Sequence, residues 1–359
     1  MNFGIDTNIN NELWHKLYAR LPATEMSPFF SPAYYNAYHA VEKADIECFW
    51  GYQNDENFLF YPYFKKSINA LGYALSDEFY DISGAYGYNG PIGNVKDAGF
   101  IAQFNDALQN HLLESKVVTE FVRYCPITAN HKYHTYTQQF DVLDNVYISL
   151  VNGLDWVWNE SFEYRVRKSI RKGESYGLNT AISRGSEVTE DDLHCFYNIY
   201  TSTMNRNDAD GFYYFDYVFF HGMLENMGDM GLLVFTYLGD KAVSAELVLL
   251  DGKLAYGFLG GTLSEFYNYK ANTFQRWELL KYLHAQGVEK YSMGGGASRG
   301  DSIYDFKMSF AKGCVNPFFI GTKVHLPDVY EEIKAQWAAK YPHAAAKHSG
   351  KLQGYRIQN

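Results

Sequence analysis

Cysteine is scarce in this chain, and its cysteines form no motif. The 359 residues include only Cys48, Cys125, Cys195 and Cys314, which lie far apart in the sequence. No CxxC or CxxH pair occurs, and the eleven histidines show no metal-ligand spacing. The sequence therefore predicts reduced thiols, no disulfide framework and no metal centre.

Long apolar runs are missing as well. No stretch of about 18 apolar residues, the length that a membrane-spanning helix needs, is present. Residues 1–11 are polar and lack the apolar segment of a secretory signal. We expect a soluble, cytoplasmic protein, and we leave peripheral contact with the inner face of the membrane open.

Positive charge is in deficit. The chain has 31 Lys and Arg against 41 Asp and Glu, a formal net charge of −10. This balance opposes a general attraction to nucleic acid, so DNA is not an expected partner. A local basic patch could still bind tRNA.

Apolar and aromatic residues, in contrast, are plentiful. They make up 47% and 18% of the chain, enough for large cores, and 359 residues exceed what one compact core usually holds. We therefore expect two domains, residues 1–152 and 153–359. Whether the protein is a monomer or a dimer stays open.

Local signals predict the elements of the first half. Ser31-Pro32 is typical of a helix start, with serine as the cap and proline in the first turn. The segment 81–93 is rich in Gly, Tyr and Asn and predicts a loop. The expected helices are 11–21, 31–40 and 97–115, and the expected strands are 46–52, 58–64, 117–124 and 146–150.

The second half alternates helices and strands in a distinctive order. Turns at Gly239-Asp240 and Asp251-Gly252 predict three antiparallel strands in a meander. The predicted elements are a basic helix (162–175), a strand (178–183), two helices (190–205 and 215–227), three strands (232–238, 242–250 and 253–260), a helix (274–287), a strand (288–293), a helix from near 303, a strand (317–324) and a helix (334–347).

These elements place the chain in the α/β (α+β) class. Each domain is expected to have a mixed, largely antiparallel central sheet flanked by helices. The first half follows a similar order of elements and so suggests a degenerate copy of the same unit, although no sequence repeat links the halves.

Four segments of the second domain carry a resemblance to a known family. They are the basic helix with Gly177-Leu178, residues 200–215, residues 255–261 with Asn272, and Gly294-Gly295-Gly296 followed by Asp305-Phe306-Lys307. The last is the most specific, because a GGG turn closes a strand and a Phe-Lys pair opens a helix ten residues after Gly296. On these motifs the chain resembles the FemA/FemB/FemX branch of the GNAT acyltransferases.

The resemblance implies two GNAT-like domains, with strands 255–260 and 288–293 splayed apart, and an enzyme that transfers an acyl or aminoacyl group onto an amine. The donor would be acyl-CoA or aminoacyl-tRNA, and the acceptor a small-molecule or lipid-linked cell-envelope precursor, a peptidoglycan peptide or an amino sugar. Residues 266–273 lack the glycines that usually hold the CoA pyrophosphate, so the donor stays open. The alternative is a non-catalytic, GNAT-derived protein that binds a peptide or a glycan.

Two residues are candidates for catalysis. An ammonium at Lys307 could stabilise the developing oxyanion or a donor phosphate, the role that the resemblance implies. Glu246 lies in an apolar strand, where a partly buried carboxylate could accept the proton of the amine. The simpler alternatives are a solvated lysine and an outward-facing strand residue, and transfer without a protein base is a further option.

Four residues are candidates for substrate binding. Arg206 could hold a carboxylate or phosphate through two hydrogen bonds, or pair with nearby aspartates. Tyr214 and Tyr256 could line the acceptor groove, or pack in the core. The resemblance implies that Phe306 packs against the donor's nucleoside.

Two segments are candidates for anion binding. Gly294, Gly295 and Gly296 expose backbone N–H groups beside a helix start, unless they are simply a tight turn. The helix 162–175 carries five basic residues, among them Arg165, Lys168 and Arg171. These side chains could bind diphosphate, RNA or anionic lipid, or form a solvated face.

Overall fold

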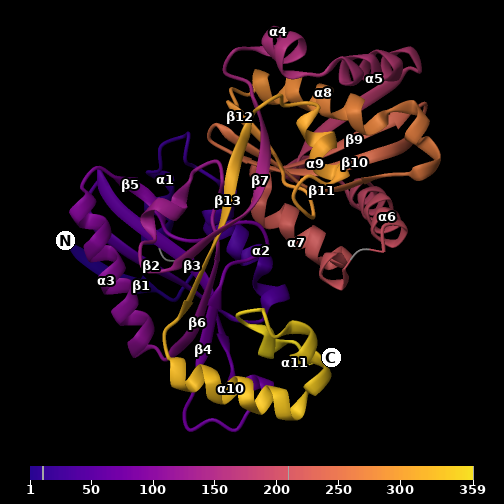
Figure 1. Ribbon diagram of the computed structural model, residues 1–359. Coiled ribbons are helices and arrows are strands. Elements are labelled where there is room, and N and C mark those ends of the chain that lie inside the picture. The colour runs from indigo at the N-terminus through magenta and orange to yellow at the C-terminus, as the bar shows by residue number, and fades with distance from the viewer. Residues whose placement is uncertain (10–11, 209, 359) are drawn as a thin grey trace. The chain divides into compact units, whose positions relative to one another are not determined.

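The computed structural model describes residues 1–9, 12–208 and 210–358 and divides the chain into two compact units (Figure 1). The first unit comprises Met1–Leu21, Phe29–Val142 and Phe318–Asn359, and the second comprises Pro22–Pro28 and Leu143–Pro317. This division differs from the predicted domains, because the C-terminal segment returns to the first unit. The predicted break at residue 152 lies close to the observed one.

The first unit contains strands and helices from both ends of the chain. Its helices are α1 (Glu12–Ala19), α2 (Pro32–Glu42), α3 (Ala98–Glu114), α10 (Pro327–Lys340) and α11 (Pro342–His348). Its strands are β1 (Asn2–Asp6), β2 (Asp45–Asn54), β3 (Asn57–Ser67), β4 (Tyr80–Ser83), β5 (Ile92–Val95), β6 (Val117–Arg123) and most of β13 (Val315–Val324). They form a sheet in the order β1-β2-β3-β4-β6-β13, with β5 also paired to β3.

The second unit is built in the same way. Its helices are α4 (Leu154–Trp156), α5 (Tyr164–Ser175), α6 (Glu190–Arg206), α7 (Tyr217–Met227), α8 (Ala271–Ala285) and α9 (Ser302–Met308). Its strands are β8 (Leu178–Arg184), β9 (Gly231–Leu238), β10 (Lys241–Asp251), β11 (Leu254–Thr262), β12 (Lys290–Gly294) and the end of β7 (Gln138–Ser149), in the sheet order β8-β9-β10-β11-β12-β7. Figure 1 shows α5 and α8 on one face of this sheet and α6 and α7 on the other.

The two sheets repeat one pairing pattern. In the first, the only parallel pair of the described strands is β4–β6; in the second it is β11–β12. The other neighbours pair in antiparallel fashion. The predicted repetition of one unit is thus confirmed, with one exchange: β7, from the middle of the chain, closes the second sheet, and β13 closes the first.

Most predicted elements are present, and the differences have local causes. Ser31 accepts a hydrogen bond from the Tyr34 amide and caps α2, as its sequence predicts. The supposed loop 81–93 has strands β4 and β5 at its ends, too short to show a periodic pattern. The terminal helix is divided because Pro342 cannot continue α10. Residue 11, the predicted start of the first helix, lies outside the described residues.

The C-terminal segment is fixed in the first unit by a buried carboxylate. Asp81 of β4 is fully buried and accepts hydrogen bonds from the Tyr355 hydroxyl at 2.6 Å, the Arg356 Nε at 2.7 Å and the Thr119 hydroxyl at 2.6 Å. A charge without solvent needs such partners. They explain why residues far apart in the sequence fold together.

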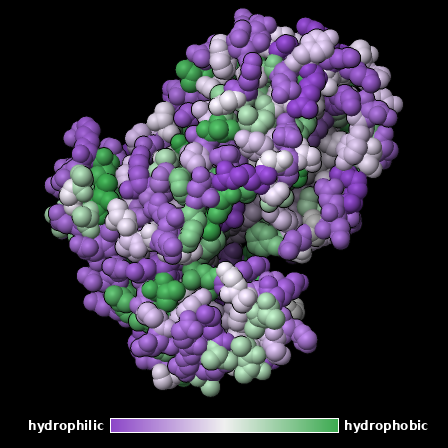
Figure 2. Space-filling model, in the orientation of Figure 1, coloured by the Kyte–Doolittle hydropathy of each residue, from purple (hydrophilic) through white to green (hydrophobic). Residues whose placement is uncertain are grey.

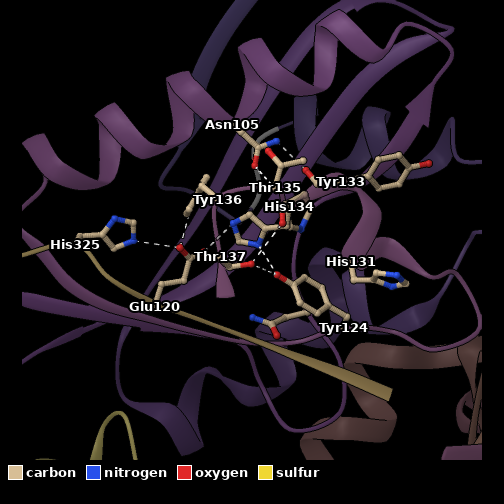
Figure 3. A network of polar contacts seen from close by, with 12 residues as sticks. Asn105, Glu120, Tyr124, His131, Tyr133, His134, Thr135, Tyr136, Thr137 and His325 are labelled. Carbon is tan, nitrogen blue, oxygen red and sulfur yellow. Dashed lines mark hydrogen bonds and ion pairs between the residues drawn. The ribbon is translucent and has the colours of Figure 1, made fainter. Parts of the chain in front are cut away.

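A second buried carboxylate lies on β6 of the first unit (Figure 3). Glu120 accepts hydrogen bonds from the Tyr136 hydroxyl at 3.0 Å and His325 Nε2 at 3.1 Å, and His134 Nε2 lies 3.3 Å from its other oxygen. Burial alone would raise the pKa of Glu120, but His134 and His325 offset it and hold the pKa below its usual range. Burial lowers the pKa of His134.

Polar side chains cover most of the face seen in Figure 2, and apolar ones occupy smaller patches. None of the described helices has both the length and the apolar composition required to cross a bilayer.

Candidate functional site

The second unit holds a pocket where its two parallel strands separate. β11 and β12 pair only at Leu254–Tyr256 and Lys290–Ser292, and β11 continues to Thr262. This confirms the predicted splay. The pocket has a volume of about 420 Å³, within the range of small-molecule sites. Its lining includes Thr203, Met204, Arg206, Asn207, Ser244, Glu246, residues 257–262, Tyr267, Asn272, Gln275, Arg276, Met293, Ile303, Phe306 and Lys307.

A β-bulge lies at the pocket wall. Leu247 pairs with Leu259 but Val248 pairs with Gly257, so Phe258 is an extra residue in β11. A regular strand alternates its faces, whereas residues 257–262 all line the pocket. The bulge thus lies directly beside the site, as bulges near active sites often do.

Gly257 is required by a close approach. A Cβ atom at this position would lie 2.6 Å from Glu246 Oε1 and 2.7 Å from the Tyr291 hydroxyl oxygen. Real Cβ atoms do not come so close to other atoms. Any larger residue at position 257 would therefore disturb both side chains.

Glu246 of β10 is held by donors from two other elements. Arg276 Nη2 on α8 lies 3.3 Å from each carboxylate oxygen, and the Tyr291 hydroxyl on β12 donates to Oε1 at 2.9 Å. Burial alone would lower the pKa of Arg276, but the charge of Glu246 raises it. The outward, solvent-facing orientation that alternation predicts is wrong, because helices cover both faces of this sheet.

Lys307 reaches the same pocket from α9. Its Nζ donates to the Gly295 carbonyl oxygen at 2.6 Å. Burial, together with the nearby charge of Arg276, lowers the pKa of Lys307 to about 8, while Glu246 and Asp301 oppose this shift. The side chain is thus still mostly an ammonium at neutral pH and can lose its proton just above it.

Phe306 and Arg206 also line the pocket. Phe306 is 37% exposed and packs edge-on against Phe310, with ring centroids 5.2 Å apart. Arg206, at the end of α6, donates to the Thr262 carbonyl oxygen at 3.0 Å and lies over the Tyr267 ring. The Phe306-Lys307 pair lies in the last turn of α9 and does not open the helix, in contrast to the prediction.

The glycine turn is organised around the chain's own carboxylate. Asp301 accepts hydrogen bonds from the amides of Ala297 at 2.6 Å, Ser298 at 2.9 Å and Tyr304 at 2.7 Å, and so caps α9. A Cβ at Gly296 would clash with this carboxylate. The turn 294–296 thus positions Lys307 through the Gly295 carbonyl, and Asp301 occupies the neighbouring amides that could have held an anion.

Eight predicted site residues are not in the pocket lining that the structure describes: Gly294, Gly295 and Gly296 of the turn above, and five others. Tyr256 is 2% exposed and packs in the core, and Tyr214 is an exposed residue of the loop after α6. On α5, Arg165 contacts Glu163 and the Asp305 carbonyl oxygen, Arg171 lies over Trp158, and Lys168 is exposed.

The sequence did not single out Gln275, Arg276 or Tyr291. Gln275 and Arg276 interrupt the apolar pattern of α8, but a polar pair on a helix ordinarily indicates a solvent-exposed face. Both are buried here, with 2% and 8% of their surface exposed. Among the described His, Cys, Asp and Glu residues, no group has an arrangement that could hold a metal ion.

A family comparison agrees with this geometry. Residues 160–308 match the family described as acetyltransferase (GNAT) domain. This segment contains every pocket residue named above. No curated protein sequence matches the chain.

Solved structures are similar to nearly the whole chain. FemX superposes with a TM-score of 0.66 and 11% identity, covering 92% of this chain and 99% of FemX. L-PGS from Bacillus licheniformis gives a TM-score of 0.55 and 12% identity, covering 89% of this chain and 95% of that one. The C-terminal domain of a putative lysylphosphatidylglycerol synthetase from Agrobacterium fabrum gives a TM-score of 0.54 and 12% identity, covering 87% of this chain and 90% of that one. These likenesses establish a shared fold.

Proposed function

Because this chain carries a GNAT acetyltransferase domain and has the fold of FemX, we propose that it is an N-acyltransferase that acts in the pocket between β11 and β12. The transferred group is an acyl or aminoacyl group, and the acceptor is an amine of a cell-envelope precursor. Two of the similar structures support a cell-envelope acceptor, whereas the choice of an amine rests on the resemblance to the FemA/FemB/FemX branch. One carries the name FemX, and another is named for lysylphosphatidylglycerol, an aminoacylated lipid.

The observation that carries the proposal is the setting of Lys307. Its side chain lines the pocket, and its ammonium is fixed by the Gly295 carbonyl, with Arg276 close enough to affect its pKa. A cation held in this way stabilises negative charge on the carbonyl oxygen as the amine attacks. We assign this role to Lys307.

Glu246 is the one carboxylate among the described residues that line the pocket. Its oxygens accept hydrogen bonds from Arg276 and Tyr291, which hold the carboxylate in one orientation. We assign it two tasks: to orient Arg276, and to receive the proton of the amine.

Arg206 and Phe306 are assigned to substrate binding. Arg206 uses one guanidinium nitrogen on the Thr262 carbonyl and presents a planar cation at the pocket, suited to a carboxylate or phosphate. Phe306 offers an exposed ring to an aromatic or apolar part of the donor.

Ligand-dependent thermal unfolding tests the proposal and identifies the donor. Acetyl-CoA, CoA and an aminoacyl-tRNA mimic are titrated in parallel into the wild type and the Lys307→Ala variant. A ligand at about 100 times its dissociation constant adds roughly 2.7 kcal/mol to folded-state stability. We expect one donor class to stabilise the wild type and to stabilise the variant less. No shift with any of the three would favour a non-catalytic peptide- or glycan-binding protein.

A further inference from the structure

Helix α8 buries two adjacent polar side chains beside the pocket. Gln275 and Arg276 are 2% and 8% exposed, and both line the pocket. Their neighbours Phe274 and Trp277 pack in the apolar core of the unit. Apolar residues at these two positions would bury well, so the polar groups have a purpose other than packing.

The side chain of Arg276 has some of its hydrogen bonds, whereas the side-chain oxygen of Gln275 has none. Arg276 Nη2 pairs with Glu246, but its buried Nε has no hydrogen-bond partner. The Gln275 Oε1 is likewise buried without a partner. Buried side-chain oxygens in folded proteins are almost always paired, so an unpaired oxygen on a side chain that lines a pocket points to a hydrogen-bond donor that a ligand supplies.

The charges around Gln275 limit which ligand groups can pair with its side-chain oxygen. Three cations, Arg206, Arg276 and Lys307, line the pocket against one carboxylate, Glu246, which is paired with Arg276. The positive balance disfavours an ammonium beside Gln275 and favours an oxygen acceptor. Gln275 Oε1 needs an N–H donor. A secondary amide combines both properties: its N–H pairs with Gln275 while its carbonyl oxygen faces the cationic donors. A dipeptide-sized group fits a pocket of about 420 Å³.

We propose that Gln275 is a specificity-determining residue that recognises a secondary amide in the substrate. The inference rests on the proposed function and deepens it, because it states that a peptide-like or N-acylated molecule enters the pocket. This amide belongs either to the pantetheine arm of the donor or to a peptide acceptor.

Stability of the unliganded protein is the first test. Gln275→Met and Gln275→Leu remove an unpaired buried oxygen, so the urea midpoint should stay unchanged or rise. The matched control is Gln139→Leu, in which Nε2 loses hydrogen bonds to the carbonyls of His131 and His134, at 3.0 and 2.8 Å. Its midpoint should fall. A comparable fall in both Gln275 variants would mean that Gln275 is structural and would overturn the inference.

Recognition is the second test, with alanylalanine and its ester counterpart alanyl-lactate as probes. The wild type should bind the peptide roughly tenfold more tightly than the ester, which lacks the N–H, and the Gln275 variants should bind both equally. Acetyl-CoA is titrated alongside, and a roughly tenfold loss of its affinity in the variants would place the amide in the donor. Unchanged affinity for all three probes would overturn the inference.

The two proposals fail in different ways. If Lys307→Ala transferred the acyl group at the full rate while the wild type still recognised the amide through Gln275, only the catalytic assignment of Lys307 would be wrong. If Lys307→Ala lost transfer but the Gln275 variants did not change amide recognition, only the specificity assignment of Gln275 would be wrong.

Discussion

Arg276 and Glu246 form an ion pair in the pocket wall, with Nη2 at 3.3 Å from both carboxylate oxygens and side chains that are only 10% and 12% exposed. Removing one partner leaves a buried charge without compensation. We expect Glu246→Ala to lower the free energy of unfolding by about 3–5 kcal/mol, measured by urea denaturation.

The double variant Glu246→Leu/Arg276→Met separates stability from function. It replaces both charges by apolar groups and should recover most of the lost stability, as such replacements often do. Acyl transfer should stay low, because Lys307 and the substrate lose their charged neighbours. Recovery of both properties would show that the pair has only a structural role.

A single methyl group at position 257 should have a similar effect. The added Cβ of Gly257→Ala would lie within 2.7 Å of Glu246 Oε1 and of the Tyr291 hydroxyl oxygen, so both of these side chains must shift. We expect a destabilisation of about 1–3 kcal/mol and loss of donor binding. Gly211→Ala is the control, since its Cβ would have no atom within 4 Å. Equal stability of the two variants would contradict the account of the close approach at Gly257.

The rate of transfer should depend on the protonation of Lys307. The pKa of Lys307 is lowered to about 8, so a role that needs its ammonium is lost as the pH rises through that value. The pH profile of the wild type should therefore fall above about pH 8, whereas Lys307→Arg, which stays charged, should not show this fall. A rate that instead rises through pH 8 would make Lys307 the proton acceptor.

The first unit should lose stability in acid. Burial lowers the pKa of His134 below the usual histidine value of about 6.5, so the unfolded chain takes up a proton that the folded state resists. The free energy of unfolding then falls as the pH drops below about 6.5, by up to about 1.4 kcal/mol per pH unit. Below the usual range of Glu, protonation of Glu120 adds to the loss.

Urea midpoints between pH 7.5 and 5 measure this effect. His134→Gln should flatten the dependence, and His221→Gln, at a histidine whose side chain is 48% exposed, should leave it unchanged. Identical slopes in all three proteins would exclude His134 as the cause.

Periodicity and turn chemistry are enough to predict the order of elements in the second unit. The meander β9–β11 and the helix α8 follow from Gly-Asp turns and apolar spacing. Such local signals do not show that β13 belongs to the first unit. Phe318–Asn359 joins that unit through contacts of Tyr355 and Arg356 with Asp81, which is distant in sequence.

The candidate site was predictable only where a motif marks it. Lys307, Phe306 and Arg206 were found from the resemblance, and the structure brings them to one pocket. Tyr256 was a poor candidate because the faces of a bulged strand cannot be assigned from alternation alone. Arg276 and Gln275 were missed because burial of polar residues on a helix depends on tertiary contacts that the sequence does not reveal.

The most direct test of the central claim is mass-spectrometric detection of acyl transfer to glucosamine and to a lysyl peptide, from acetyl-CoA and from alanyl-tRNA. Lys307→Ala is compared with the wild type and with Lys312→Ala, a lysine exposed to solvent. We predict N-acylated product with the wild type and with Lys312→Ala, and a yield at least about 100-fold lower with Lys307→Ala. Product formation by Lys307→Ala at the wild-type rate would contradict the account.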